Sequence, residues 1–238
     1  MAEPLGPVDE GLWCASQPLR FGGLELGARM TVVRLQGGGL LLHSPIDPTP
    51  ELRDAVAGLG PVRHVVAPNR FHHLFAGRWS EAGPDVQLHV APGLLAKRPD
   101  LAAAGARELG AAAEPAWSAD LDQAAVGGMP WVNEVAFLHR PSRTLISSDL
   151  AFRVGPEMPR LTRIAFRAMG AYDRLATTPL ERLLVRDRAA TRASLERLLR
   201  WDFDRVGVGH GRIQEERGHE AFGFFAFLHQ WDLLCSFA

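Results

Sequence analysis

The sequence predicts a mixed α/β (α+β) protein in which two β-sheets pack face to face and helices cover their outer surfaces. Two observations support this fold class. Strand-forming segments come first as hairpins and are followed by alternating helix and strand, and this order occurs twice along the 238 residues. No segment has the composition of a linker, so we expect one domain over residues 1–238. A chain with 47% hydrophobic and 22% charged residues can bury a sizeable core.

The first half is expected to begin with strands and continue with alternating helix and strand. Residues 49–59 predict a helix, because Thr49 is a favourable N-cap, Pro50 suits the first turn and Gly60 ends it. The other elements expected here are strands at 12–16, 24–26, 30–35, 40–43, 62–67 and 86–90, a turn at 37–39, a helical turn within 71–79, and a helix over 94–109 that is broken at Pro99.

The second half repeats this pattern. Its expected elements are a hairpin of 131–138 with 144–146, an amphipathic piece around 161–168 within the irregular span 152–177, helices at 180–185 and 189–201, a strand at 205–208 and a terminal helix at 216–237. Five arginines lie in the span 152–177. They suit a solvated helix face, or contact with an anionic substrate or a partner subunit.

Three short polar segments each follow a strand that is apolar enough to be buried. They are APNRFHH at 67–73, SSDL at 147–150 and VGHG at 208–211. Ligands of α/β proteins are usually held at such strand ends. We therefore expect a metal site formed by His72, His73, Asp149 and His210, because these residue types suit a borderline divalent ion.

Each segment also has a simpler interpretation. The two histidines could be one packed and one solvated residue at a helix start, and Asp149 could be a helix N-cap. His210 could be an incidental residue in a glycine turn. A vestigial site, stabilised by hydrogen bonds between histidine and aspartate, therefore remains an alternative to a metal site.

In this order, the motifs resemble those of the metallo-β-lactamase superfamily, and the chain is most similar to an uncharacterised bacterial branch with degenerate metal motifs. The hairpin MTVVRLQGGGLLLHSPID is similar to the family's first strands, which end at an aspartate, here Asp47. HVVAPNRFHH lies where the family has His-x-His-x-Asp-His, RTLISSDLAF where its metal-bridging aspartate ends a strand, and VGVGHGR where its last histidine ligand lies. The resemblance implies a four-layer αββα sandwich.

The departures from the family pattern are as informative as the matches. If the histidine pair is aligned with the family's Asp-His, Pro68 and Arg70 occupy the first two histidine positions. Residues 129–131 (Met-Pro-Trp) occupy the region of another expected histidine. The comparison implies that the first metal site is lost.

The second metal site of the family is retained in outline. In one register its ligands would be His72, His73, Asp149 and His210, and in a shifted register only His73, Asp149 and His210. A single Zn²⁺ ion, or alternatively Fe or Mn, would lower the pKa of its water to about 7 and support hydrolysis.

We therefore expect, if the protein is an enzyme, a mononuclear metal-dependent hydrolase of an ester, thioester, amide or phosphoester. The alternative is a non-catalytic member of the fold that binds no metal and uses its cleft for a ligand or partner. A di-iron redox role would need a full two-metal ligand set, which this sequence lacks.

Charge and apolar patterning limit the partners. With 26 basic and 27 acidic residues, the chain lacks the excess of positive charge that nucleic acids or anionic membranes attract, so we expect a small-molecule substrate or ligand. The acidic N-terminus MAEPLGPVDEG has no apolar signal region, no apolar run approaches about 18 residues, and the two cysteines suit free thiols; these features predict a cytoplasmic protein. The aromatic terminal helix would suit a homodimer.

Overall fold

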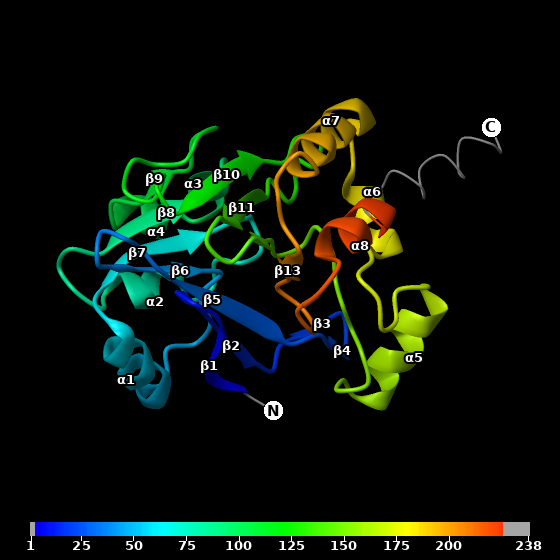
Figure 1. Ribbon diagram of the computed structural model, residues 1–238, viewed down its shortest axis with the longest axis horizontal. Coiled ribbons are helices and arrows are strands. Elements are labelled where there is room, and N and C mark those ends of the chain that lie inside the picture. Colours follow the sequence, from blue (N-terminus) through cyan, green and yellow to red (C-terminus); the bar gives the residue numbers. More distant parts are fainter. Residues whose placement is uncertain (1–2, 226–238) are drawn as a thin grey trace.

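The computed structural model describes residues 3–225 and contains two mixed sheets (Figure 1). The larger sheet has the spatial order β1 (Glu3–Asp9), β2 (Leu12–Gln17), β5 (Ala28–Arg34), β6 (Leu40–His43), β7 (Val62–Ala67), β8 (Gln87–Val90) and β9 (Arg107–Glu108). The smaller sheet has the order β10 (Leu121–Ala125), β11 (Val135–His139), β12 (Thr144–Ile146) and β13 (Arg205–Gly207). A short ribbon of β3 (Arg20–Phe21) and β4 (Leu24–Glu25) stands apart.

Both sheets change from antiparallel to parallel pairing. Strands β1 to β6 of the larger sheet pair antiparallel, and β6 to β9 pair parallel. In the smaller sheet β10 to β12 are antiparallel, and β12 and β13 are parallel. Parallel neighbours end at the same edge of a sheet, so the loops after β12 and β13 emerge together.

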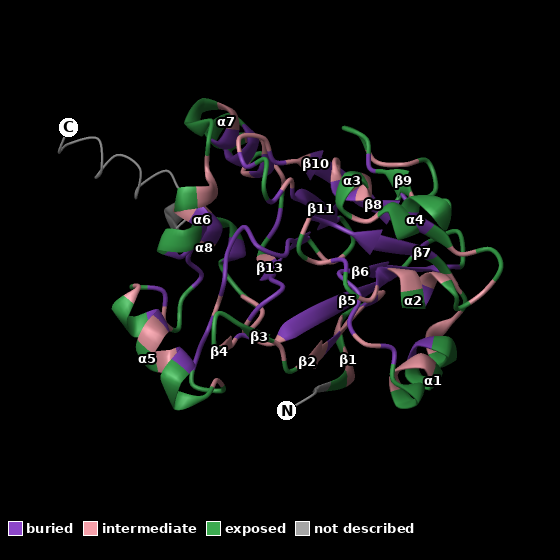
Figure 2. Ribbon diagram, turned by 180° about the vertical axis from the view of Figure 1, so that it is seen from behind, coloured by how far each residue is buried: buried purple, intermediate pink, exposed green. Residues whose placement is uncertain are grey.

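Alternating side chains divide the core into layers. Leu41 and Val66 point between the two sheets, whereas Leu42 and Val65 point to the outer face of the larger sheet. The helices covering that outer face are α1 (Pro50–Leu59), α2 (Ala76–Ser80), α3 (Leu94–Lys97) and α4 (Pro99–Ala103). Helices α7 (Arg188–Leu198) and α8 (Gly218–Phe225) cover the smaller sheet (Figure 2). The expected four-layer sandwich is therefore confirmed.

The strongest local signals match the structure closely. Thr49 caps α1, and its hydroxyl accepts a hydrogen bond from the Leu52 amide at 3.3 Å. The strands expected at 40–43 and 62–67 have the observed bounds. The amphipathic piece in the span 152–177 is α5 (Arg160–Ala168), and α6 (Pro179–Leu184) follows it.

Other expectations need correction. The helix expected over 94–109 is two short helices, because Pro99 starts α4 and Gly105, with φ of 79°, turns the chain into β9. Strands β1 and β10 were not anticipated: β1 contains Pro4, Gly6 and Pro7, which disfavour strands, and it lies at a sheet edge where proline is tolerated.

The helix expected at 216–237 begins at Gly218, and its portion beyond Phe225, with Cys235 and the suggested dimer contact, lies outside the described residues. Between residues 3 and 225, none of the helices has both the length and the apolar character needed to cross a membrane.

Candidate metal centre

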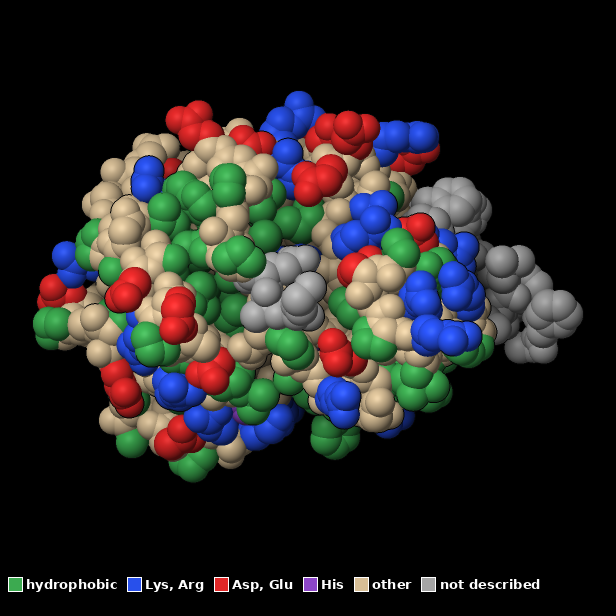
Figure 3. Space-filling view, turned by 90° about the horizontal axis from the view of Figure 1, so that it is seen from below, with side chains coloured by type: hydrophobic (Ala, Val, Ile, Leu, Met, Phe, Trp, Pro, Cys, Tyr) green, Lys and Arg blue, Asp and Glu red, His purple; other side chains and the backbone are tan. Residues whose placement is uncertain are grey.

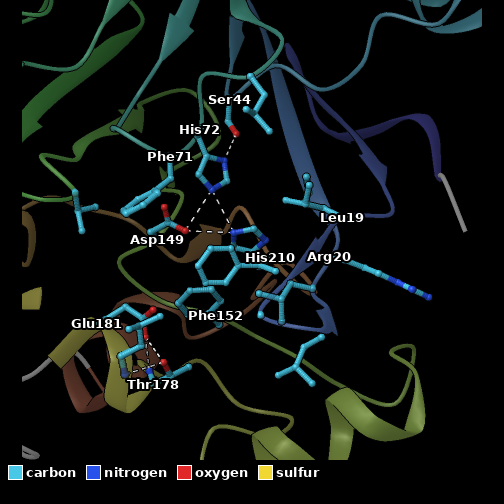
Figure 4. Close-up of a pocket in the computed structure, with 18 of the residues that line it drawn as sticks. Leu19, Arg20, Ser44, Phe71, His72, Asp149, Phe152, Thr178, Glu181 and His210 are labelled. Atoms are coloured by element: carbon cyan, nitrogen blue, oxygen red, sulfur yellow. Dashed lines mark hydrogen bonds and ion pairs between the residues drawn. The ribbon is translucent and has the colours of Figure 1, made fainter. Parts of the chain in front are cut away.

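The loops after three strands bring their side chains to one point (Figure 4). His72 comes from the turn after β7 in the larger sheet. Asp149 and His210 come from the loops after β12 and β13 in the smaller sheet. The prediction that the three polar segments converge is confirmed for these three residues, which can each offer one ligand atom within 4.8 Å of the others.

The three ligand atoms form a nearly equilateral triangle. His72 Nε2 lies 3.2 Å from Asp149 Oδ1 and 3.2 Å from His210 Nε2, and His210 Nε2 lies 3.2 Å from Asp149 Oδ1. For metal–ligand bonds of about 2.1 Å, tetrahedral ligands stand about 3.4 Å apart and octahedral neighbours about 3.0 Å apart. The triangle therefore fits one divalent ion with further positions open.

The far side of each imidazole ring is held in place. His210 Nδ1 donates a hydrogen bond to the carbonyl oxygen of Gly27 at 2.6 Å, which leaves the Nε2 lone pair free in the neutral ring. His72 Nδ1 lies 2.6 Å from the hydroxyl of Ser44. The Phe152 ring stacks on His210 at 5.3 Å between centroids, with an interplanar angle of 7°. Such outer contacts orient histidine ligands in metal sites.

Asp149 is a carboxylate in this setting. Burial alone would raise its pKa, but the interactions of its Oδ1 with His72 and His210 outweigh burial and keep the pKa well below its usual value. Its Oδ2 accepts a hydrogen bond from Asn69 Nδ2 at 2.7 Å. Asp149 therefore directs only Oδ1 toward the histidines.

Two buried residues that the sequence did not single out organise this arrangement. The Asn69 side-chain oxygen accepts hydrogen bonds from the Phe71 and His72 amides at 2.8 and 2.7 Å. Glu134 accepts from the Ser148 and Asp149 amides at 2.6 and 2.7 Å and contacts the Asn69 amide at 3.2 Å. Burial, followed by the nearby Asp149 charge, raises the pKa of Glu134. The sequence feature that could have identified Glu134 is an acidic residue directly before the apolar strand β11.

The two glycines of the Gly-His-Gly segment are there for different reasons. A Cβ on Gly209 would lie 2.7 Å from His72 Cε1 and 3.0 Å from the Ser148 carbonyl oxygen. Gly211 has φ of 82°, and a Cβ there would lie 2.1 Å from the Arg153 carbonyl oxygen. Both glycines are required for the loop to approach His72 and place His210.

His73 is not brought to the cluster, so the expected ligand set that includes it needs correction. Its Nδ1 lies 2.7 Å from Arg98 Nη1, and burial together with the charges of Lys97 and Arg98 lowers its pKa to about 4. Adjacent residues of a turn project in different directions, so only one histidine of the pair can face the triangle. His72 does so, and neither sequence register describes the site fully.

The residues at positions where the family's metal ligands are expected to be lost make structural contacts instead. The Pro68 carbonyl accepts a hydrogen bond from the Val135 amide at 2.8 Å. The Arg70 guanidinium donates to the Pro130 carbonyl at 2.9 Å, and Met129 is buried. Across residues 3–225, His72, Asp149 and His210 form the sole grouping of three or more potential metal ligands.

A pocket of about 610 Å³ opens in front of the triangle. Its volume is in the range of small-molecule sites. The three cluster residues line it, and the β3–β4 ribbon, the turn at 71–75, Phe166 of α5 and Leu180 of α6 contribute to its walls. A small molecule in this pocket would lie next to the three candidate ligands.

Comparison with solved structures shows the fold. A metallo-beta-lactamase from Pontibacter korlensis is 14% identical, with a TM-score of 0.64 over 97% of this chain and 99% of that one. FIM-1 from Pseudomonas aeruginosa, in its mono-zinc form, is 12% identical with a TM-score of 0.62 over 96% of each chain. A metallo-beta-lactamase from Hirschia baltica is 12% identical with a TM-score of 0.61 over 94% of this chain and 97% of that one.

Comparison at the level of sequence found fewer matches than comparison of structures. No curated protein matches the chain. One family model, described as a domain of unknown function (DUF4336), matches residues 9–194, which include His72 and Asp149 but not His210. The chain therefore belongs to the DUF4336 family, and it has the metallo-beta-lactamase fold.

Proposed function

We propose that the protein binds one divalent metal ion through His72, Asp149 and His210 and is a metal-dependent hydrolase. The observation that supports this most strongly is the triangle itself. Its three atoms are 3.2 Å apart and directed at one another. The lone pair of His210 Nε2 and the negative charge of Asp149 repel each other at this distance unless a cation or a proton lies between them.

The residues around the triangle favour one ion over two. Asn69 donates a hydrogen bond to Oδ2 of Asp149, and Oδ1 is the carboxylate oxygen that faces the two histidines. Two histidines and one carboxylate suit Zn²⁺, Fe²⁺ or Mn²⁺ with open positions. A bound ion of this kind supplies Lewis acidity and hydroxide near neutral pH. The chain holds the ligands in place through Gly27, Ser44 and Asn69, and the pocket admits the substrate.

The alternative is a metal-free site that binds a ligand without reaction. It has one supporting observation: 3.2 Å is also a hydrogen-bond distance, so a proton on His72 or His210 could hold the same triangle together. The two proposals differ in metal content, in metal-dependent stability and in activity.

The test begins with chelator-treated protein. Addition of Zn²⁺, Mn²⁺ or Fe²⁺ should give about one bound ion per chain in elemental analysis. It should also raise the melting temperature, because an ion at 100 times its dissociation constant stabilises by about 2.7 kcal/mol. His210→Ala should abolish both effects. His219→Ala is the matched control, since this exposed histidine of α8 is not part of the cluster and contacts the Leu199 carbonyl.

Activity is tested on a panel of esters, thioesters, amides and phosphoesters. Hydrolysis that is lost with chelator, restored by metal and absent from His210→Ala would support the proposed metal-dependent hydrolase. Protein that takes up no ion and melts at the same temperature with each metal would overturn the proposal and leave the metal-free alternative.

A further inference from the structure

The pocket in front of the candidate metal centre has mostly apolar walls. The side chains of this kind that line it include Leu24, Leu26, Phe71, Phe152, Phe166 and Met169. Leu26, Phe152 and Phe166 belong to a hydrophobic cluster that is separate from the cores of the two sheets. This cluster continues to the site, because the Phe152 ring stacks directly on His210.

The apolar lining reaches the protein surface. Among the described residues, eight large hydrophobic side chains are exposed, and four of them line this pocket: Phe21, Phe71, Leu74 and Leu180. Leu74 is 57% exposed and Leu180 is 45% exposed. Exposed apolar groups that gather around a cavity are typical of a ligand-binding entrance.

Few charges face the pocket. Of the described lining residues, Arg20, Lys97, Asp149 and Glu181 carry ionisable acidic or strongly basic groups. Lys97 Nζ donates to the Arg70 carbonyl at 2.8 Å and lies over the Phe71 ring. Glu181 is engaged with Thr178 in the capping box that starts α6.

The arginines of α5 are not among the residues that line the pocket. Figure 3 shows many lysine and arginine side chains on the outer surface, with a dense group at the end of the molecule that carries α5 and α6. A phosphoryl group is normally recognised by converging arginines or lysines. This lining therefore favours a neutral, apolar ligand over a phosphoester.

We infer that the substrate class is an ester or thioester with a large hydrocarbon group, seated between the β3–β4 ribbon, α5 and α6 with its carbonyl toward the triangle. The inference rests on the proposed function for its chemistry but not for its binding. In the reaction, the oxygen of water bonds to the acyl carbon and the acyl C–O or C–S bond breaks. The leaving alcohol or thiol takes up one proton of that water, the acid keeps the other, and nothing is oxidised or reduced.

The test uses two leucines on one helix. Leu180 of α6 lines the pocket, whereas Leu183 of the same helix is 72% exposed and does not. Leu180→Arg should weaken binding of apolar ligands at least about ten-fold, since it replaces apolar contact area with charge. Leu183→Arg should leave binding unchanged. Leu74→Arg, on another wall of the pocket, is a second variant in case Leu180→Arg fails to fold.

Binding is measured on metal-free protein, by displacement of the neutral fluorescent probe Nile red with 1-dodecanol. Hydrolysis is measured on metal-loaded protein with p-nitrophenyl acetate and p-nitrophenyl decanoate. We expect displacement by 1-dodecanol, and a kcat/KM at least about ten-fold higher for the decanoate. Leu180→Arg should reduce that preference.

The outcomes separate the two proposals. Displacement without metal uptake would contradict the metal-dependent hydrolase and leave the apolar pocket supported. Metal uptake and ester hydrolysis with no displacement, no chain-length preference, or equal behaviour of the Leu180 and Leu183 variants would overturn the inference and leave the hydrolase intact.

Discussion

The side-chain amide of Asn69 donates a 2.7 Å hydrogen bond to Oδ2 of Asp149. The other oxygen of Asp149 faces the two histidines. A carboxylate that bridges two metal ions with one oxygen on each needs both oxygens, and here one of them accepts a hydrogen bond. The same amide also contacts Glu134, at 3.2 Å, so Asn69 links a candidate ligand to a buried acid. This relationship is why we propose a mononuclear site.

Substituting Asn69 should weaken metal binding although Asn69 touches no metal. Asn69→Ala frees Asp149 Oδ2 and removes the acceptor of the Phe71 and His72 amides. Loss of such an outer contact typically costs 10–100-fold in metal affinity, and the unpaired buried groups should cost about 1–3 kcal/mol of stability. Competition with a chromogenic chelator measures the affinity, and urea unfolding measures the stability.

Asn133→Gly is the control for this prediction. The Asn133 amide donates to the Pro92 carbonyl at 3.0 Å, and glycine tolerates its φ of 47°. It should keep the wild-type metal affinity. Wild-type affinity in Asn69→Ala would show that Asp149 needs no support from this amide.

The neighbouring histidines 72 and 73 should behave differently. His72→Ala removes one corner of the triangle and should abolish uptake of the ion. His73→Ala removes a contact with Arg98 and should retain about one ion per chain, with some loss of stability. Elemental analysis after dialysis gives the stoichiometry of each variant. Loss of the ion from both variants would restore His73 to the ligand set.

Close packing at the glycine loop leads to a third prediction. Gly209→Ala would place a Cβ 2.7 Å from His72 Cε1 and 3.0 Å from the Ser148 carbonyl oxygen, so the His72 ring or the loop must shift. We expect metal affinity to fall at least about ten-fold, because a displaced ligand weakens the site. Gly207→Ala is the matched control two residues earlier, where the nearest atom to a new Cβ is 3.8 Å away. Equal affinities in the two variants would contradict the packing argument.

Local patterns in the sequence were sufficient for most of the fold. The Thr49 cap and the apolar runs of β6 and β7 determine those elements with little help from the rest of the chain. Strand β10 was missed because its sequence, LDQAA, has weak strand preference and forms through pairing with β11. Its formation depends on residues distant in the sequence, which local patterns do not include.

The candidate site was predictable in its order along the chain but not in its details. Asp149 and His210 follow clear strand ends, and the structure brings them together with His72. The choice between His72 and His73 depends on side-chain directions in an irregular turn, which spacing does not determine. The supporting roles of Ser44 and Gly27 depend on contacts with residues 28 and 183 positions away.

A buried histidine pair between the sheets, outside the candidate site, sets a pH limit on stability. His89 Nε2 lies 3.3 Å from His64 Nδ1, and the His89 ring meets the edge of Trp117 at 4.7 Å between centroids. Burial lowers the pKa of His89 from 6.5 to about 4 and also lowers that of His64. The native state therefore disfavours the imidazolium form of both rings.

Since these folded-state pKa values lie below the unfolded one, the unfolded chain binds more protons in mild acid. The stability that the neutral rings contribute is complete above about pH 6.5 and is lost as the pH falls below it; for His89 the loss continues to about pH 4, at up to about 1.4 kcal/mol per pH unit. His89→Phe keeps an aromatic ring against Trp117 but cannot take up a proton. Its free energy of unfolding should fall less steeply than that of the wild type between pH 6.5 and 4.5, as measured by urea unfolding. At pH 8 both rings are neutral, so any difference there reports packing alone, and parallel curves below pH 6.5 would mean that His89 does not control the acid lability.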